Sequence, residues 1–415
     1  MQTNQFDVIV VGSGAAAAHA AYPLVKAGLN VAMVDGGVEA KTEAKKKFDK
    51  DFEGIRREDT DQYKLFLGDD ISGIAPAKGK EVHVISMAGG NRGYVSEKTD
   101  LLPIDSKGVQ VVQSLAKGGL SEIWAALCDI FDKEELEAVG IPSDVMHENY
   151  QEVMDRIGMS GVSKDYTIQE PLEFNNHAKT IFKKHGGLSE KKKNGFIAEH
   201  PLHAVITKPF KGRDPFSYKD LEYAANVGDS IYRPRFTIEE LEESENFTYL
   251  PDRIVEKISH DGDLRKVIVK RFDSTKEDFS ARFVVLAAGS LNSTKILLKS
   301  FSLINTPVPF ITKTHFIIPS VHLRTLGKKD DRRQSSLCQL VVKDEKESVQ
   351  FGDRLFAQFH TYKSFLLFRL AKYIPLPVSE AMSFLSILAP SFVMLDVRFP
   401  SLEKENKTSA YLNED

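Results

Sequence analysis

The sequence predicts an α/β protein with two parts: a doubly wound, Rossmann-like domain and a second domain of the α+β type built on an antiparallel sheet. Residues 8–11 and 31–34 are short apolar runs, typical of strands buried on both faces of a parallel sheet. Residues 15–27 between them read as a helix, which Gly28 ends. Beyond residue 305, further strand-like segments follow that suit a separate antiparallel sheet.

The chain has 415 residues, more than one hydrophobic core usually serves. We expect a discontinuous first domain, 1–155 and 196–305, an unassigned helical connection, 156–195, and a partial second domain, 306–415. The formal charge, 55 − 59 = −4, does not favour a nucleic-acid partner. With only two cysteines, a disulfide framework and a cysteine-rich metal site are not expected, and a reducing compartment fits.

The N-terminus resembles no secretory signal, and no stretch offers the roughly 20 consecutive apolar residues of a spanning helix. We therefore expect a soluble, cytoplasmic protein. Two apolar helix candidates, 364–374 and 379–389, are too short to span a bilayer. We expect them to pack against the second sheet; the alternative is contact with a membrane surface.

The opening stretch contains a G-x-G-x-x-A pattern formed by Gly12, Gly14 and Ala17. In a dinucleotide-binding turn the first glycine allows the strand-to-helix turn, and the second leaves room for a pyrophosphate. The small third residue lets the helix pack closely on the sheet. The helix would then present free N–H groups and its positive dipole end to the phosphates. A plain strand–turn–helix without a ligand is the alternative.

An acidic residue stands where such a site needs one. Asp35 follows the second predicted strand and lies 35 − 14 = 21 residues beyond Gly14. At that spacing a carboxylate holds a ribose hydroxyl and favours an unphosphorylated adenosine ribose. The pattern itself leaves FAD and NAD open.

Three further stretches of the sequence favour FAD over NAD as the cofactor. Gly36 and Gly37 follow Asp35, where many nicotinamide enzymes have other residues. Residues 114–128, "SLAKGGLSEIWAALC", contain a Gly-Gly-Leu-Ser turn and the only tryptophan, and residues 282–298 begin "RFVVLAAGS". In this order the stretches resemble the glucose–methanol–choline (GMC) family of FAD-dependent oxidoreductases, from about residue 6 to residue 300.

The resemblance implies roles for particular residues. The FAD pyrophosphate would lie against the glycine turn at Gly12 and Gly14, and the adenosine ribose would bind Asp35. The flavin side of the cofactor would lie against the Gly-Gly-Leu-Ser turn. The strand "DRIVEKI" resembles the one that offers backbone groups to adenine, and "LAAG" the close approach beside the dinucleotide. The candidate cofactor-binding residues are Gly12, Ser13, Gly14, Ala15, Ala17, Asp35, Gly36, Gly37, Gly118, Gly119, Leu120, Ser121, Val255, Ala288 and Gly289.

The chain departs from the family pattern in two places. Ala125 and Ala126 stand where the family often has a glycine pair after the tryptophan. The family's C-terminal catalytic histidine, in a stretch resembling His-x-x-Gly-Thr, is not found, so no catalytic residue is assigned. His315 and His360 are the only candidates worth testing, and a structural role in the second domain is expected for both. The sequence thus resembles the N-terminal three-quarters of a GMC protein.

Two hypotheses about function follow. The first is an FAD-dependent oxidoreductase that acts on the CH–OH group of a small alcohol, with hydride transfer to flavin N5 and a histidine taking the hydroxyl proton. The second is a non-catalytic or incomplete flavin-binding protein, such as a fragment or a subunit completed by another chain. An NAD-linked dehydrogenase is disfavoured by the Gly-Gly-Leu-Ser and Ala-Ala-Gly motifs.

Overall fold

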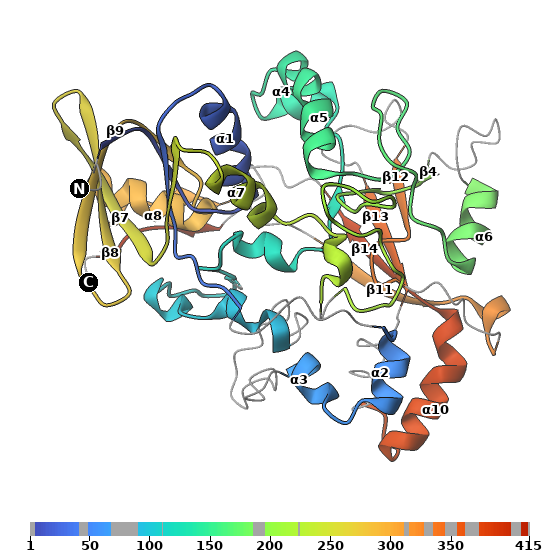
Figure 1. Cartoon of the computed structure of the whole chain (residues 1–415). Coiled ribbons are helices and arrows are strands. Elements are labelled where there is room, and N and C mark those ends of the chain that lie inside the picture. Colours follow the sequence, from blue (N-terminus) through green and yellow to red (C-terminus); the bar gives the residue numbers. More distant parts are fainter. Residues whose placement is uncertain are drawn as a thin grey trace.

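The computed structural model describes residues 5–40, 49–67, 90–109, 111–185, 196–222, 225–310, 315–327, 335–344, 355–361, 373–399 and 408–413. Two larger sheets lie on opposite sides of the molecule in Figure 1, with helices around them. One sheet is largely parallel and the other wholly antiparallel, so the predicted fold class is confirmed.

The first sheet has six strands in the order β6-β2-β1-β9-β8-β7. Four of them run parallel: β6 (Phe247–Leu250), β2 (Val31–Val34), β1 (Gln5–Val11) and the second half of β9 (Lys276–Leu286). Helix α1 (Ala15–Lys26) joins β1 to β2; Ala27 is its C-cap, and Gly28 follows at φ +82°. The predicted strand–helix–strand unit is therefore present.

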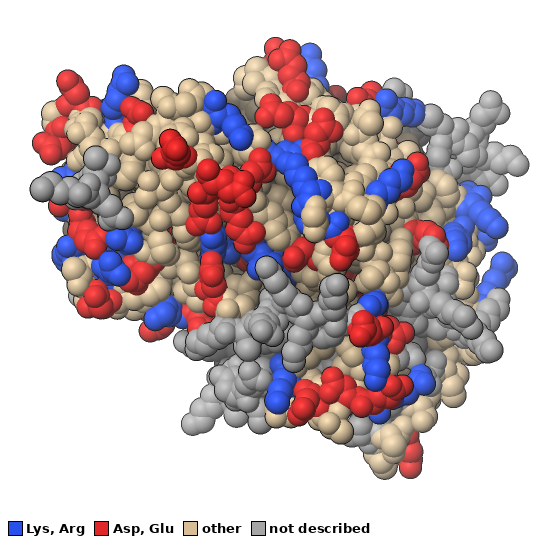
Figure 2. Space-filling model, in the orientation of Figure 1, with Lys and Arg blue, Asp and Glu red and all other residues tan. Residues whose placement is uncertain are grey.

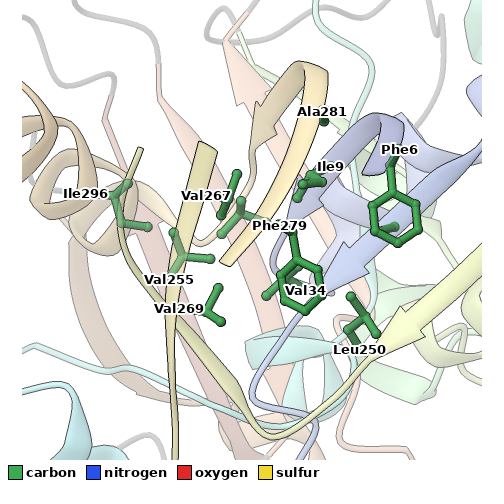
Figure 3. Close-up of a cluster of buried hydrophobic side chains, with 12 residues drawn as sticks. Phe6, Ile9, Val34, Leu250, Val255, Val267, Val269, Phe279, Ala281 and Ile296 are labelled. Atoms are coloured by element: carbon green, nitrogen blue, oxygen red, sulfur yellow. The ribbon is translucent and has the colours of Figure 1, made fainter. Parts of the chain in front are cut away.

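Strand β1 is buried on both faces because successive side chains point to opposite sides of the sheet. Val8 and Val10 pack under α1 together with α7 (Pro234–Glu242). Ile9 and Val11 point to the other core, shown in Figure 3, which β7 (Arg253–Asp261), β8 (Leu264–Arg271) and Ile296 of α8 (Ser290–Ser300) complete.

Strand β9 takes part in both kinds of pairing. Its first half pairs antiparallel with β8, and from residue 280 onward it pairs parallel with β1. The hairpin between β7 and β8 turns at Gly262 and Asp263, flanked by the paired residues Asp261 and Leu264. This long strand places the "LAAG" segment directly beside the end of β1.

The second sheet has the order β11-β14-β13-β12-β4, all antiparallel. Four strands come from the predicted region: β11 (His315–Val321), β12 (Leu340–Asp344), β13 (Phe356–Thr361) and β14 (Phe392–Arg398). The fifth, β4 (Phe196–Glu199), comes from the segment assigned to the first domain. The domain limits themselves stay a prediction.

The remaining elements surround the two sheets (Figure 1). Small pairs join β3 (Leu127–Cys128) to β5 (Leu202–His203) and β10 (Val308–Pro309) to β15 (Ser409–Ala410). The other α-helices of the described residues are α2 (Phe52–Glu58), α3 (Gln62–Leu67), α4 (Lys133–Ala138), α5 (Ser143–Ile157), α6 (Asn176–His185) and α10 (Val378–Leu388).

Helix α10 matches the predicted helix 379–389, whereas 364–374 lies almost wholly outside the described residues. Within the described ranges, every helix is too short or too polar to cross a bilayer.

Candidate dinucleotide-binding site

The turn between β1 and α1 can hold only glycine at its first position. Gly12 has φ +99°, and a Cβ placed on it would lie 2.6 Å from the carbonyl oxygen of Ala287. The same Cβ would lie 3.1 Å from the Cα of Ala288. Ala287 N–H donates to Val11 at 2.9 Å, which fixes the "LAAG" segment beside the turn. Gly12 is therefore required by the chain's own packing.

Gly14 differs from Gly12, because the described residues around it leave room for a side chain. It is the N-cap of α1 at φ −64°, which any residue can adopt, and a Cβ built there meets no atom of the described residues within 4 Å. Ala15 begins the helix, and Ala17 is fully buried against the sheet. The unbonded N–H groups of the first turn and open space beside Gly14 are what a phosphate group needs.

Ser13 ties three separated segments together. Its hydroxyl donates to Asp35 Oδ2 at 2.7 Å and accepts from Gly118 N–H at 3.0 Å. A Cβ on Gly119 would lie 3.4 Å from Gly14 Cα. The opening turn, the acid and the Gly-Gly turn, predicted from distant parts of the chain, thus meet at one place.

The Asp35 carboxyl is buried and well supplied with donors. Oδ2 accepts from Ser13, from Tyr249 Oη at 2.8 Å and from Gly37 N–H at 2.9 Å. Burial raises the pKa of Asp35 to about 6, although these hydrogen bonds act to lower it. Because all three contacts meet Oδ2, a ribose hydroxyl would have to bind Oδ1.

The two glycines after Asp35 also serve the local packing. A Cβ on Gly36 would lie 2.7 Å from Leu115, and one on Gly37, at φ +67°, would lie 2.5 Å from Pro251. Both positions bring the loop after β2 against neighbouring chain. Their contact with a cofactor stays a prediction.

The Gly-Gly-Leu-Ser turn needs glycine at its first two positions. Gly118 and Gly119 have φ of +95° and +60° and begin a short 3₁₀ helix, η4 (Gly119–Ile123). Gly118 is buried, Gly119 and Ser121 are half-buried, and Leu120 is 41% exposed, so the Leu120 side chain lies nearest the surface.

The remaining candidates lie around this centre. Gly289, at φ +76°, is the N-cap of α8. Val255 places its side chain in the core and pairs with Val269, so only its backbone is suited to adenine. The start of β7 does reach the site, since Arg253 N–H donates to the Asp35 carbonyl at 3.0 Å.

A buried polar cluster beside Gly118 was not anticipated. Glu122 is 1% exposed, and its Oε2 accepts from Tyr94 Oη at 3.0 Å and from Arg233 Nη1 at 3.4 Å. Arg92 lies in the same region and is 3% exposed. A glutamate inside the apolar run "LSEIWAALC" is the sequence feature that could have indicated this cluster.

The positions where the chain departs from the family also have clear local roles. Trp124 Nε1–H donates to the Tyr232 carbonyl at 2.8 Å. Its ring packs against a hydrophobic cluster that includes Met154 and Leu202. Ala126 is fully buried at φ +56°, so alanine here holds the left-handed backbone that glycine adopts more easily.

The two candidate histidines lie in the second sheet. His315 begins β11, opposite Arg398. His360 of β13 is buried, with Nε2 3.3 Å from Gln358 Oε1 and Nδ1 3.4 Å from the Ser336 carbonyl oxygen. Buried His203 is near His360, and burial lowers its pKa to about 3.

The parallel sheet, the glycine turn and the helix N-terminus form a Rossmann-like domain, the class of fold in which dinucleotides bind at this turn. No protein-family model matches the chain, and no curated protein matches it.

Among solved structures, the chain is similar to pyridoxine 4-oxidase from Mesorbium loti, with a TM-score of 0.50 and 12% identity. The match covers 95% of this chain and 71% of that one. A flavoprotein/dehydrogenase from Cytophaga hutchinsonii matches with a TM-score of 0.29 and 10% identity over 95% of this chain and 56% of that chain. The flavin-dependent monooxygenase PieE, solved in complex with FAD and substrate, matches with a TM-score of 0.28 and 8% identity. That match covers 95% of this chain and 43% of that chain. The similarity to pyridoxine 4-oxidase supports the fold alone. The TM-scores of the other two structures are too low to support a conclusion about this chain.

Proposed function

We propose that this chain binds FAD and is a GMC-type oxidoreductase that acts on the CH–OH group of a small alcohol. The observation that carries the proposal is the open space beside Gly14, at the N-terminus of α1. The Ser13 hydroxyl, through Gly118, holds the Gly-Gly turn against this space. The sequence resemblance adds the expected order of motifs around it.

The residues present fit the group. Gly12, Gly14 and Ala15 would hold the pyrophosphate, and Oδ1 of Asp35 would accept from the ribose. The backbone of Gly118 would lie against the flavin side. The bound flavin would supply the hydride acceptor, while this chain binds and orients the alcohol.

The hydroxyl proton needs an acceptor that is neutral near pH 7. Burial lowers the pKa of His360, so its imidazole is neutral at that pH. We therefore rank His360 first among the histidines to test as the proton acceptor.

The test combines binding and reaction. FAD is titrated into the apoprotein and followed by flavin fluorescence for the wild type, Gly14→Ala and Gly14→Val. We expect both variants to lose FAD affinity, Val the more, while Gly14→Ala changes the free energy of unfolding by about 1 kcal/mol or less. Stoichiometric FAD in purified Gly14→Val would refute the pyrophosphate site.

The reaction is followed by flavin bleaching under anaerobic conditions with primary and secondary alcohols, pyridoxine among them. Bleaching with one alcohol supports the CH–OH donor, and its loss in His360→Gln would support the proposed proton acceptor. FAD binding without bleaching by any alcohol would contradict the proposed reaction and favour the second candidate.

One observation favours that second candidate, a flavin-binding subunit completed by a strand from another chain. Beyond Ala281, β9 pairs with β1 on one side, and the described residues provide no strand on the other. Phe283 in this part is 63% exposed. An open apolar edge favours strand addition. Light scattering should show self-association that Phe283→Lys reduces; a monodisperse monomer would speak against this candidate.

A further inference from the structure

Four residues form a buried cluster directly beside the Gly-Gly turn. Arg92 and Tyr94 come from the 3₁₀ helix η2 (Gly90–Ser96), Glu122 from η4, and Arg233 immediately precedes α7. Their exposed fractions are 3%, 8%, 1% and 4% respectively. Segments distant in the sequence therefore bring two guanidinium groups and one carboxylate into the interior.

Two arginines of this cluster share one carboxylate, and buried Glu222 lies close enough to Arg92 to interact with its charge. Glu122 Oε2 already accepts from Tyr94 and Arg233, and Arg235 Nε lies 3.9 Å from the same oxygen. Arg235 also pairs with Asp229 at 3.2 Å. Among the described residues, no ion pair within 4 Å reaches Arg92.

Nitrogen atoms in this cluster lack partners. Among the described residues, Arg92 Nε and Nη2 and Arg233 Nη2 are buried without a hydrogen-bond acceptor, and Glu122 Oε1 and Glu222 Oε2 are buried without a donor. Burial and the nearby Arg233 lower the pKa of Arg92 to about 9, so Arg92 is still charged near pH 7. Burial and Asp220 raise the pKa of Glu222, which weakens it as a counter-charge.

A buried charge without a partner is costly and normally requires a counter-ion. On the face that Figure 2 shows, side chains of both signs of charge are present, with acidic side chains gathered over α7. We propose that Arg92 and Arg233 form a binding site for an anionic group, a phosphate or a carboxylate. Paired guanidinium groups suit the oxygens of either.

The location joins this site to the nucleotide turn. A Cβ on Gly118 would overlap Glu122 Oε1, so the carboxylate lies directly against the turn. Gly118 N–H in turn donates to Ser13. The anion can therefore be part of a bound dinucleotide or the acidic group of a separate small molecule. The site stands on the arginines themselves and does not depend on FAD binding.

The experiment measures thermal unfolding of the apoprotein in inorganic phosphate and in chloride at equal ionic strength. Phosphate should raise the melting temperature of the wild type. Arg92→Met should melt higher than the wild type in chloride, because an unpaired buried charge is gone, and should show no phosphate effect. A purely structural arginine would give a lower melting temperature in both salts.

Arg253→Met is the matched control, since Arg253 is paired with Glu277 at 2.9 Å in the β7–β8 hairpin region. It should keep the full phosphate effect. Arg92→Lys keeps the positive charge but loses the planar guanidinium group, so it should keep part of the stabilisation by phosphate. This variant replaces Arg92→Met in the test if Arg92→Met does not fold. An undiminished phosphate effect in Arg92→Met, or in Arg92→Lys if Arg92→Met does not fold, would overturn the proposal.

Two titrations distinguish the sources of the anion. If the site takes the diphosphate, Arg92→Met weakens FAD and ADP about tenfold or more and leaves riboflavin unchanged. If it takes a separate anion, FAD affinity is unchanged and phosphate still stabilises the FAD-loaded wild type but not the variant. Failure of the wild type to bind FAD would refute the proposed function, while the phosphate result on apoprotein would still decide the anion site.

Discussion

Asp35 couples the stability of the chain to pH with a defined sign. Burial raises its pKa from 3.8 to about 6 in the folded state. A shift of about 2 units corresponds to about 3 kcal/mol. Because the folded pKa lies above the unfolded one, the folded chain binds more protons between about pH 4 and 6. The contribution of Asp35 to stability is therefore complete at low pH and is lost as the pH rises through 6.

Asp35→Asn removes this titration. The free energy of unfolding of the variant, minus that of the wild type, should rise by about 3 kcal/mol between pH 3.5 and pH 7. Urea unfolding at half-unit pH steps measures the difference, in which the other titrating groups largely cancel.

Asp273→Asn is the control with the opposite sign. Asp273 is exposed, and the Thr275 N–H lowers its pKa, so its contribution to stability grows as the pH rises. A difference between Asp35→Asn and wild type that does not change with pH would refute the reasoning from burial.

The same residue gives a test of nucleotide binding. A ribose hydroxyl that donates to Asp35 favours the ionised carboxylate, so FAD affinity should fall as the pH drops below 6. The affinity of Asp35→Asn should be weaker at pH 7, by about 1.5–3 kcal/mol, and should lack this fall. Equal affinity at pH 7 would show that Asp35 does not bind the ribose.

Three further substitutions test the local structure by urea unfolding. Gly12→Ala should cost at least about 2 kcal/mol, because φ +99° and the 2.6 Å approach to the Ala287 oxygen leave no room for a Cβ; a smaller loss would place the turn differently. Ser302→Gly should stabilise by about 0.5–1 kcal/mol, because exposed Ser302 has φ +54° just after α8, and a loss of stability would contradict this. Trp124→Phe should cost about 1 kcal/mol through the lost hydrogen bond to the Tyr232 carbonyl, and an unchanged stability would show that this bond contributes nothing net.

The sequence by itself determined the strand–turn–helix at the N-terminus and four of the five strands of the second sheet; β4 came from the segment assigned to the first domain. These elements depend on local patterns: apolar runs, a glycine turn and a helix stop, all read within about 30 residues. The fold class followed because such units pack in few ways. The same patterns named Gly12 and Gly14, and the residue types at those positions carry their physical reason with them.

The tertiary structure alone decided what lies beside what. Gly118 N–H donates a hydrogen bond to Ser13, which is 105 residues away in the sequence. Arg233 donates to Glu122 across a separation of 111 residues. Neither pairing leaves a periodic pattern, because each depends on how β1, η4 and α7 pack. The burial of Arg92 cannot be predicted from the sequence for the same reason: an arginine is expected at the surface until the fold removes it from water.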